Sequence, residues 1–148
     1  MPTPQPREYT DLGWHLAQHL HKTGVVTDPA DPGDDAPGIA VGGWTEQHPD
    51  TCVSIIGPWE TNPDSLTVPN LRFMVAVRAP AQRDVWAMRQ QVHQALRTGN
   101  KRVRLTADVS MLNCARVVSD PPVPDQNRNW VAVDTYVCRP YRDRNHNE

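Results

Sequence analysis

The chain has 148 residues, with fifteen Lys or Arg against seventeen Asp or Glu, so its formal charge at neutral pH is −2. That length suits one domain with a single core. No apolar stretch approaches the roughly 18–20 residues that span a bilayer, and the Pro-rich start lacks the basic and apolar segments of a signal peptide. We therefore expect one domain over residues 1–148 that neither crosses a membrane nor is secreted.

The charge is divided unevenly along the chain. Residues 1–68 hold two basic and ten acidic side chains, whereas residues 69–148 hold thirteen basic and seven acidic ones. Such a split is typical of a nucleic-acid-binding face, a charged tail, or a chain whose halves meet other copies of itself. Alternatively, the two halves interleave in the fold and the asymmetry disappears from the surface.

The three cysteines form neither a disulfide framework nor a CxxC metal module, because their number is odd and no two are close. Cys52, Cys114 and Cys138 each lie in an apolar stretch. A reduced cysteine in that setting behaves as a small buried hydrophobe. We therefore expect synthesis in a reducing cytoplasm.

Proline sets the element boundaries in the first half of the chain, since it breaks helix interiors and central strands. Apolar residues at three- and four-residue spacing predict a helix from about residue 7 to Gly24. An exposed acidic loop is expected over 27–37, followed by strands at 39–44 and 51–57. Gly42 and Gly43 predict a bend, and residues 58–69 a polar, turn-forming stretch.

The second half opens with the clearest strand, 71–79, in which apolar side chains alternate with Arg72, Met74, Ala76 and Arg78. A helix over 80–98 follows, closed by Gly99. Two further strands, 103–107 and 111–118, lead through a Pro-rich hairpin (119–128) to a last strand at 130–138. The charged tail 140–148 is expected to fray.

This order predicts an α+β fold: an antiparallel β-sheet of about five or six strands with two α-helices packed on one face.

Catalytic and cofactor motifs are not found. His15 and His19 lie four residues apart on the first helix, which suits a metal, but a third ligand is missing, so a packed pair is the stronger interpretation. Cys52 and Cys114 have no adjacent base that would make either a nucleophile. We expect no catalytic residue, metal or cofactor. The basic stretch 97–104 lacks interleaved aromatics, which weakens a nucleic-acid-binding interpretation.

Five tryptophans are many for a chain with one Phe and three Tyr. Trp86 and Trp130 are assigned to the core. Trp44 and Trp59 lie where strands pass into loops, a position from which large aromatics anchor protein–protein contacts. These two, with Arg72 and Arg78, are the candidate interface residues.

The element order resembles that of the tail-terminator (tail-completion, or minor capsid) proteins of long-tailed bacteriophages. The resemblance is carried by the helix ending at Gly24, the acidic stretch leading to Ile39–Trp44, the segment Pro49–Pro58, the strand Leu71–Arg78 running into the helix 80–98, the hairpin 120–128 and the strand ending at Arg139. It therefore covers nearly the whole chain.

The resemblance implies a structural virion protein at the tail–neck junction. Its relatives form a hexameric ring on the finished tail tube, stop its polymerisation, and present a surface to the head–tail connector or stopper protein. DNA would pass through the ring without specific binding, and Asp31, Asp34 and Asp35 are candidates for its lining. The alternatives are another neck component, such as a head-completion or stopper protein, a small cytoplasmic metal-binding enzyme using His15 and His19, and a nucleic-acid-binding module.

Overall fold

The computed structural model describes residues 11–31, 33–60, 70–98, 101–106 and 109–142. Two helices and seven strands follow one another in these ranges: α2 (Leu12–Lys22), β1 (Gly38–Val41), β2 (Cys52–Glu60), β3 (Leu71–Ala79), α3 (Gln82–Leu96), β4 (Val103–Arg104), β5 (Val109–Ser119), β6 (Val123–Pro124) and β7 (Trp130–Arg142). The α+β class is confirmed. The predicted start of the first helix, near residue 7, and the predicted end of the second helix at Gly99 lie outside the described residues.

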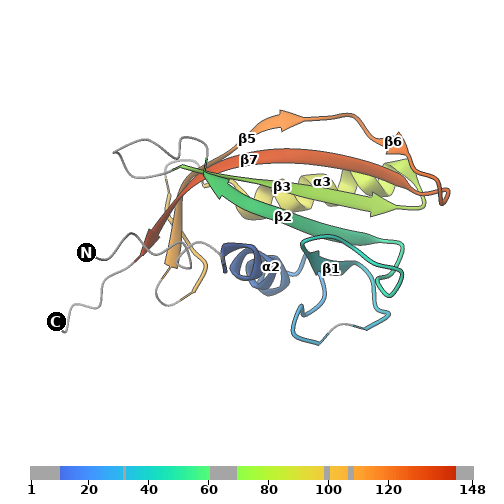
Figure 1. Cartoon of the computed structure of the whole chain (residues 1–148), viewed down its shortest axis with the longest axis horizontal. Helices are drawn as coiled ribbons and strands as arrows, with labels where there is room; N and C mark the ends of the chain where they lie inside the picture. The colour runs from blue at the N-terminus through green and yellow to red at the C-terminus, as the bar shows by residue number, and fades with distance from the viewer. Residues whose placement is uncertain (1–10, 32, 61–69, 99–100, 107–108, 143–148) are drawn as a thin grey trace.

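The strands form one curled sheet in the order β1-β2-β3-β7-β5-β4, with β6 paired to β7 (Figure 1). Every pairing is antiparallel except that of β1 with β2, which is parallel. The prediction of a purely antiparallel sheet was therefore wrong at this edge. The connection 42–51 is too long for a tight hairpin and returns the chain to the starting end of β1, so β2 runs in the same direction.

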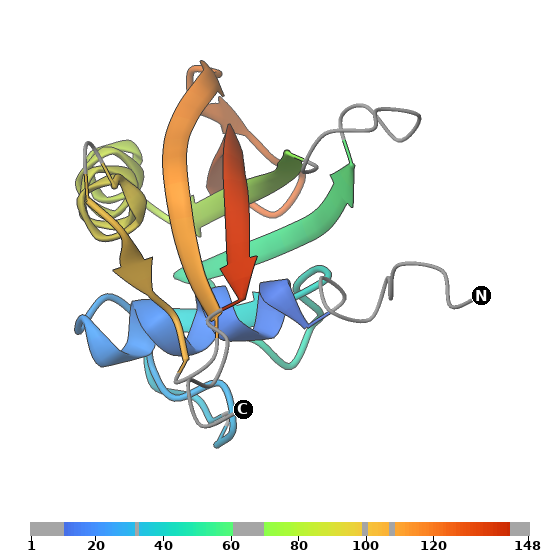
Figure 2. The same ribbon diagram turned by 90° about the vertical axis from the view of Figure 1, so that its left-hand side faces the viewer.

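Both helices pack on the same face of the sheet (Figures 1 and 2). Helix α2 contacts β1 and β2, while α3 contacts β3, β5 and β7, and the two helices touch each other. Leu12, Leu16 and Leu20 of α2 are buried at four-residue spacing. They join one core cluster with the inward side chains of β2, β3 and β7. The arrangement of two helices on one face is confirmed.

Strand β3 supplies the centre of the core. Its inward residues include Phe73, whose ring stacks on that of Tyr136 in β7 with centroids 5.4 Å apart. The three cysteines are also buried, as expected. Burial raises the pKa of the Cys52 thiol to about 11 and that of Cys138 to about 12, so both remain protonated at neutral pH.

Strand β2 continues beyond its predicted end. Residue 57 was expected to be the last, yet the strand passes through Pro58 to Glu60. The pairing with β3 shifts between Ile56 and Trp59, where Gly57 has a φ of +108°. Because a bulge leaves a residue out of the hydrogen-bond ladder, the missing N–H of proline is tolerated there.

Strand β7 is also longer than predicted. It runs to Arg142, with Arg139 opposite Leu112 and Pro140 opposite Met111 of β5. The segment 140–142 is therefore part of the sheet, and the expectation of a frayed tail from residue 140 was wrong for those residues. Residues 143–148 lie outside the described part.

The charge split follows the sheet. Strands β1 and β2 come from the acidic first half of the chain and lie at one edge, whereas β5 and β4 come from the basic second half and lie at the other. The two halves do not interleave along the sheet, so the alternative that the fold removes the asymmetry is not what the topology shows.

Candidate interaction surface

The sheet face opposite the helices, here called the outer face, is mainly apolar. In each strand pair, directly opposed residues project to the same side, so the register identifies its members. Its rows are Trp59–Arg72–Val137–Ala115, Ile56–Met74–Thr135–Val118, Ser54–Ala76–Val133 and Cys52–Arg78–Val131–Val123.

No described helix covers this face, and several of its side chains reach solvent. Val118 is 44% exposed and Val123 56% exposed, and Met74, Val133, Thr135 and Val137 are half-buried, whereas Cys52, Ser54, Ala76 and Arg78 are buried. A contiguous apolar patch on a sheet is typical of a protein–protein contact. The outer face is therefore the candidate interaction surface of the molecule.

At one end of the outer face Trp44 meets Arg78. The guanidinium carbon of Arg78 lies 4.5 Å from the centroid of the Trp44 ring. The same guanidinium donates through Nε to the Asp50 carbonyl at 3.0 Å and through Nη2 to the Pro49 carbonyl at 2.9 Å. Arg78 is 8% exposed, and these two hydrogen bonds attach the connection 42–51 to the sheet. The positive φ of Gly42 and Gly43 lets the chain bend away after Val41, as predicted.

A hollow of about 530 Å³ opens beside this pair. It lies between the connection 42–51 and the turn after β6. Its lining is polar and consists of Trp44, Thr45, Glu46, His48, Asp50, Arg78, Asp125, Asn127 and Asn129. Among the described residues, two of the four predicted interface residues, Trp44 and Arg78, thus share one concave site.

At the other end of the outer face Trp59 and Arg72 are directly opposed on β2 and β3. Trp59 is 41% exposed and Arg72 is half-buried. The Trp59 ring lies against the backbone of Gly57, where an added Cβ would be 3.0 Å from a ring carbon. The four predicted interface residues therefore form two aromatic–arginine pairs at opposite ends of one surface.

The other tryptophans divide differently from the prediction. Trp130 is partly buried and packs against the core, as expected. Trp86 is 50% exposed, so its assignment to the core was wrong. It lies on the solvent side of α3, and the Arg89 guanidinium carbon lies 5.2 Å from its ring centroid.

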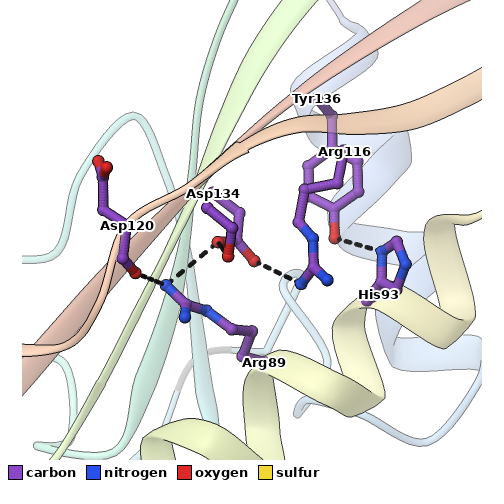
Figure 3. A network of polar contacts seen from close by, with 7 residues as sticks. Arg89, His93, Arg116, Asp120, Asp134 and Tyr136 are labelled. Carbon is purple, nitrogen blue, oxygen red and sulfur yellow. Dashed lines mark hydrogen bonds and ion pairs between the residues drawn. The ribbon is translucent and has the colours of Figure 1, made fainter.

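A buried ionic network joins α3 to β5 and β7 (Figure 3). The Asp134 carboxylate faces Arg89 at 3.1 Å and Arg116 at 3.3 Å, and it accepts a hydrogen bond from the Ser119 hydroxyl at 2.8 Å. Arg89 also donates to the backbone carbonyl of Asp120, whose own carboxylate points away from the network. Two guanidinium groups share one carboxylate, which leaves a net positive charge.

Next to this network His93 and Tyr136 are in hydrogen-bond contact, with Nδ1 and the hydroxyl oxygen 3.2 Å apart. Burial, followed by the cations of Arg116 and Arg97, lowers the pKa of His93 against the opposing effect of Asp134. Burial and the charge of Asp134 raise the pKa of Tyr136. His93 is therefore neutral at pH 7, and the phenol retains its proton.

Two of the three histidines of α2, His19 and His21, are in hydrogen-bond contact with backbone carbonyls. His19 Nε2 lies 3.0 Å from the carbonyl oxygen of Ala95, which links the two helices. Across the described ranges, no group of three or more His, Cys, Asp or Glu side chains is placed to hold a metal ion. His15 and His19 thus lack the third ligand there that a zinc site would need.

The predicted lumen residues lie together in the acidic loop. Asp31, Asp34 and Asp35 are all exposed. A backbone hydrogen bond of 3.0 Å from Thr27 to Pro37 closes the loop at its base. The loop leads directly into β1 and therefore lies at one edge of the sheet.

The ionic network was missed by sequence reasoning, although the signal was present. Asp134 alternates with Ala132 and Tyr136 on the inward side of β7, and Arg89 follows Val85 by four residues on the buried side of α3. A single charge of each sign on two apolar faces predicts a buried ion pair.

Comparisons with known proteins show a likeness in fold but no match in sequence. No family model matches the sequence, and no curated protein matches it. In the described ranges no helix is long and apolar enough to cross a membrane. A chain in the solved virion of a native gene transfer agent particle superposes with a TM-score of 0.59, at 13% sequence identity, over 86% of this chain and 92% of that one. The chain therefore shares its fold with a protein of that particle over nearly its full length.

Proposed function

We propose that this chain is a structural protein of a phage-like particle and acts as a tail terminator. In this role identical subunits form a six-membered ring on the end of the tail tube, stop its polymerisation, and offer a surface to the head–tail connector. The observation that carries the proposal is the fold shared with a chain of a gene transfer agent virion over 86% of this chain. The sequence resemblance to tail terminators, found independently, supports the finer role.

The outer face suits such a role. A cap must contact both its neighbours in the ring and a partner above or below it, so it needs more than one adhesive surface. The apolar rows between the Trp44–Arg78 and Trp59–Arg72 pairs supply a wide surface of the kind that docks on another protein. We assign this surface to the contact with the tail tube or connector, with the two tryptophans as anchors.

The chemistry of the described residues agrees with a structural role. The three cysteine thiols are buried, and burial raises the pKa of each, so none is an activated nucleophile. The proposal therefore includes no catalysis and no cofactor. DNA would traverse the ring without sequence-specific contacts.

The test is deletion of the gene from the genome that encodes this chain, followed by electron microscopy of the particles. A tail terminator predicts tails of irregular, excessive length that are not joined to heads. Restoration of uniform tails by the wild-type gene in trans is the control. Filled heads beside separate tails of normal length would instead identify a head-completion or stopper protein, and normal particles would contradict both roles.

A further inference from the structure

A cationic hollow lies at the β5 edge of the sheet. Its volume is about 470 Å³, and it is lined by His93, Arg97, Asn113, Cys114, Ala115 and Arg116. The end of α3 is fastened to this edge, because Thr98 Oγ1 accepts from the Cys114 amide at 2.9 Å. Strand β4 pairs with β5 only near Ser110 and Met111, so the hollow lies where the described part of the sheet ends.

The hollow carries surplus positive charge. Arg116 is paired with Asp134, but that carboxylate also faces Arg89, so the three groups together retain one positive charge. Arg97 is exposed and adds a second. Among the residues that the structure describes, Asp134 is the one carboxylate paired with this group of arginines. Two guanidinium groups around a hollow form a site for a carboxylate or another anion.

The acidic loop has the complementary properties. Residues 27–37 contain four aspartates and no Lys or Arg. Asp31, Asp34 and Asp35 are exposed, and the hydrogen bond between Thr27 and Pro37 holds the loop together at its base. It projects below β1 in Figure 1, while β5 lies along the opposite edge of the sheet. The loop therefore lies at the far edge from the hollow of its own chain.

Two unlike, complementary patches on opposite edges are what a head-to-tail contact between identical subunits requires. We infer that the acidic loop of one subunit packs against the cationic hollow of the next, with Asp34 and Asp35 facing Arg97 and Arg116. The inference rests on the proposed ring and names its subunit contact. It gives these aspartates a role in assembly in place of the lumen lining that the sequence resemblance suggested.

The experiment is a charge exchange in the full chain. Arg97→Glu reverses one side of the contact, the double variant Asp34→Lys/Asp35→Lys reverses the other, and the triple variant restores complementarity with inverted sign. Arg83→Glu and Asp120→Lys are matched controls, because both residues are exposed and lie outside the hollow and the loop. Circular dichroism and thermal unfolding verify that each variant is folded.

Self-association is measured by sedimentation velocity and native mass spectrometry, in solution and on isolated tail tubes. We expect each one-sided reversal to weaken it roughly tenfold or more at low salt, because like charges placed opposite each other are strongly unfavourable. The triple variant regains wild-type association, and the controls match wild type. The differences shrink at about 1 M salt, where the Debye length is only ~3 Å.

Four results would overturn the inference. The one-sided variants could associate like wild type, or the triple variant could stay impaired. The other two results are an Arg97→Glu variant that loses DNA binding but not self-association, and an Asp34→Lys/Asp35→Lys ring that assembles normally but blocks DNA passage. The last two would assign the hollow to nucleic acid and the loop to the lumen. Failure of the proposed function would be a separate outcome. If the subunits form rings in a charge-dependent way but the rings do not bind tail tubes, the subunit contact is supported and the tail-terminator role is contradicted.

Discussion

The guanidinium of Arg78 lies over the ring of Trp44, 4.5 Å from its centroid, although 34 positions separate the two residues in the sequence. Arg78 lies near the end of the central strand β3, and Trp44 belongs to the connection 42–51 that turns the chain back toward β2. The pair therefore fixes a long loop against one end of the outer face, and it gives that end a defined shape.

Arg78→Met tests this relationship. The change removes the cation over Trp44 and both hydrogen bonds to the Pro49 and Asp50 carbonyls. We expect the free energy of unfolding in urea to fall by about 1–3 kcal/mol, since the two carbonyls lose a charged donor. Arg72→Met is the control on the same strand and face, and its expected change is within ~0.5 kcal/mol. Equal stability of the two variants would contradict the role given to Arg78.

Asp134→Asn tests the buried ionic network. The carboxylate is 5% exposed and is the shared partner of Arg89 and Arg116, so its neutralisation leaves two guanidinium groups without a counter-charge. We expect a loss of about 3 kcal/mol in unfolding free energy. Asp120→Asn removes a nearby carboxylate that points away from the network and should change stability by less than ~0.5 kcal/mol. An Asp134→Asn variant that loses little unfolding free energy would show that the network is not needed for folding.

The lowered pKa of His93 predicts that the folding stability depends on pH. Its pKa is lowered in the folded state by burial and by Arg116 and Arg97, so below the ordinary value the unfolded chain binds a proton that the folded chain does not. The His93 contribution to stability is therefore present above about pH 6.5 and is lost as the pH falls through and below that value. An NMR titration should place His93 below the usual range, and Arg97→Gln should move it upward. A His93 that titrates normally in wild type, or does not respond to Arg97→Gln, would contradict this arrangement.

Trp59→Ala tests the outer face as a docking surface. Because Trp59 is 41% exposed, its truncation should cost folding little, yet the loss of an aromatic anchor should weaken attachment to tail tubes about tenfold or more. Trp86→Ala is the matched control, since Trp86 is 50% exposed on α3 and lies away from the outer face. If both variants bind tubes equally well, the outer face is not the docking surface.

The local pattern predicted much of the fold. The strict alternation from Leu71 to Ala79 gave the bounds of β3, and the apolar spacing of α3 placed it to within two residues at each end. The errors share a cause, because each depends on a partner distant in the sequence. Pro58 remains in a strand only because β3 accommodates a bulge there, and residues 140–142 are ordered by pairing with β5.

The four interface residues stay a prediction, and what the structure adds is how they are paired. Sequence position singled out Trp44, Trp59, Arg72 and Arg78, yet only the register of β2 on β3 and the course of the connection 42–51 reveal two pairs on one face. Trp86 was wrongly assigned to the core because a tryptophan on a helix was interpreted as a core residue. The outward direction of its side chain depends on where the sheet lies relative to α3.

We expect subunits of this chain to cap a tail tube as a ring. The most direct measurement is cryo-electron microscopy of isolated tail tubes, prepared without this protein and then incubated with the purified wild-type chain. We expect a six-fold ring at one end of each tube and no further growth when tube subunits are added. Tube ends that stay bare and continue to elongate in a saturating concentration of the folded chain would contradict it.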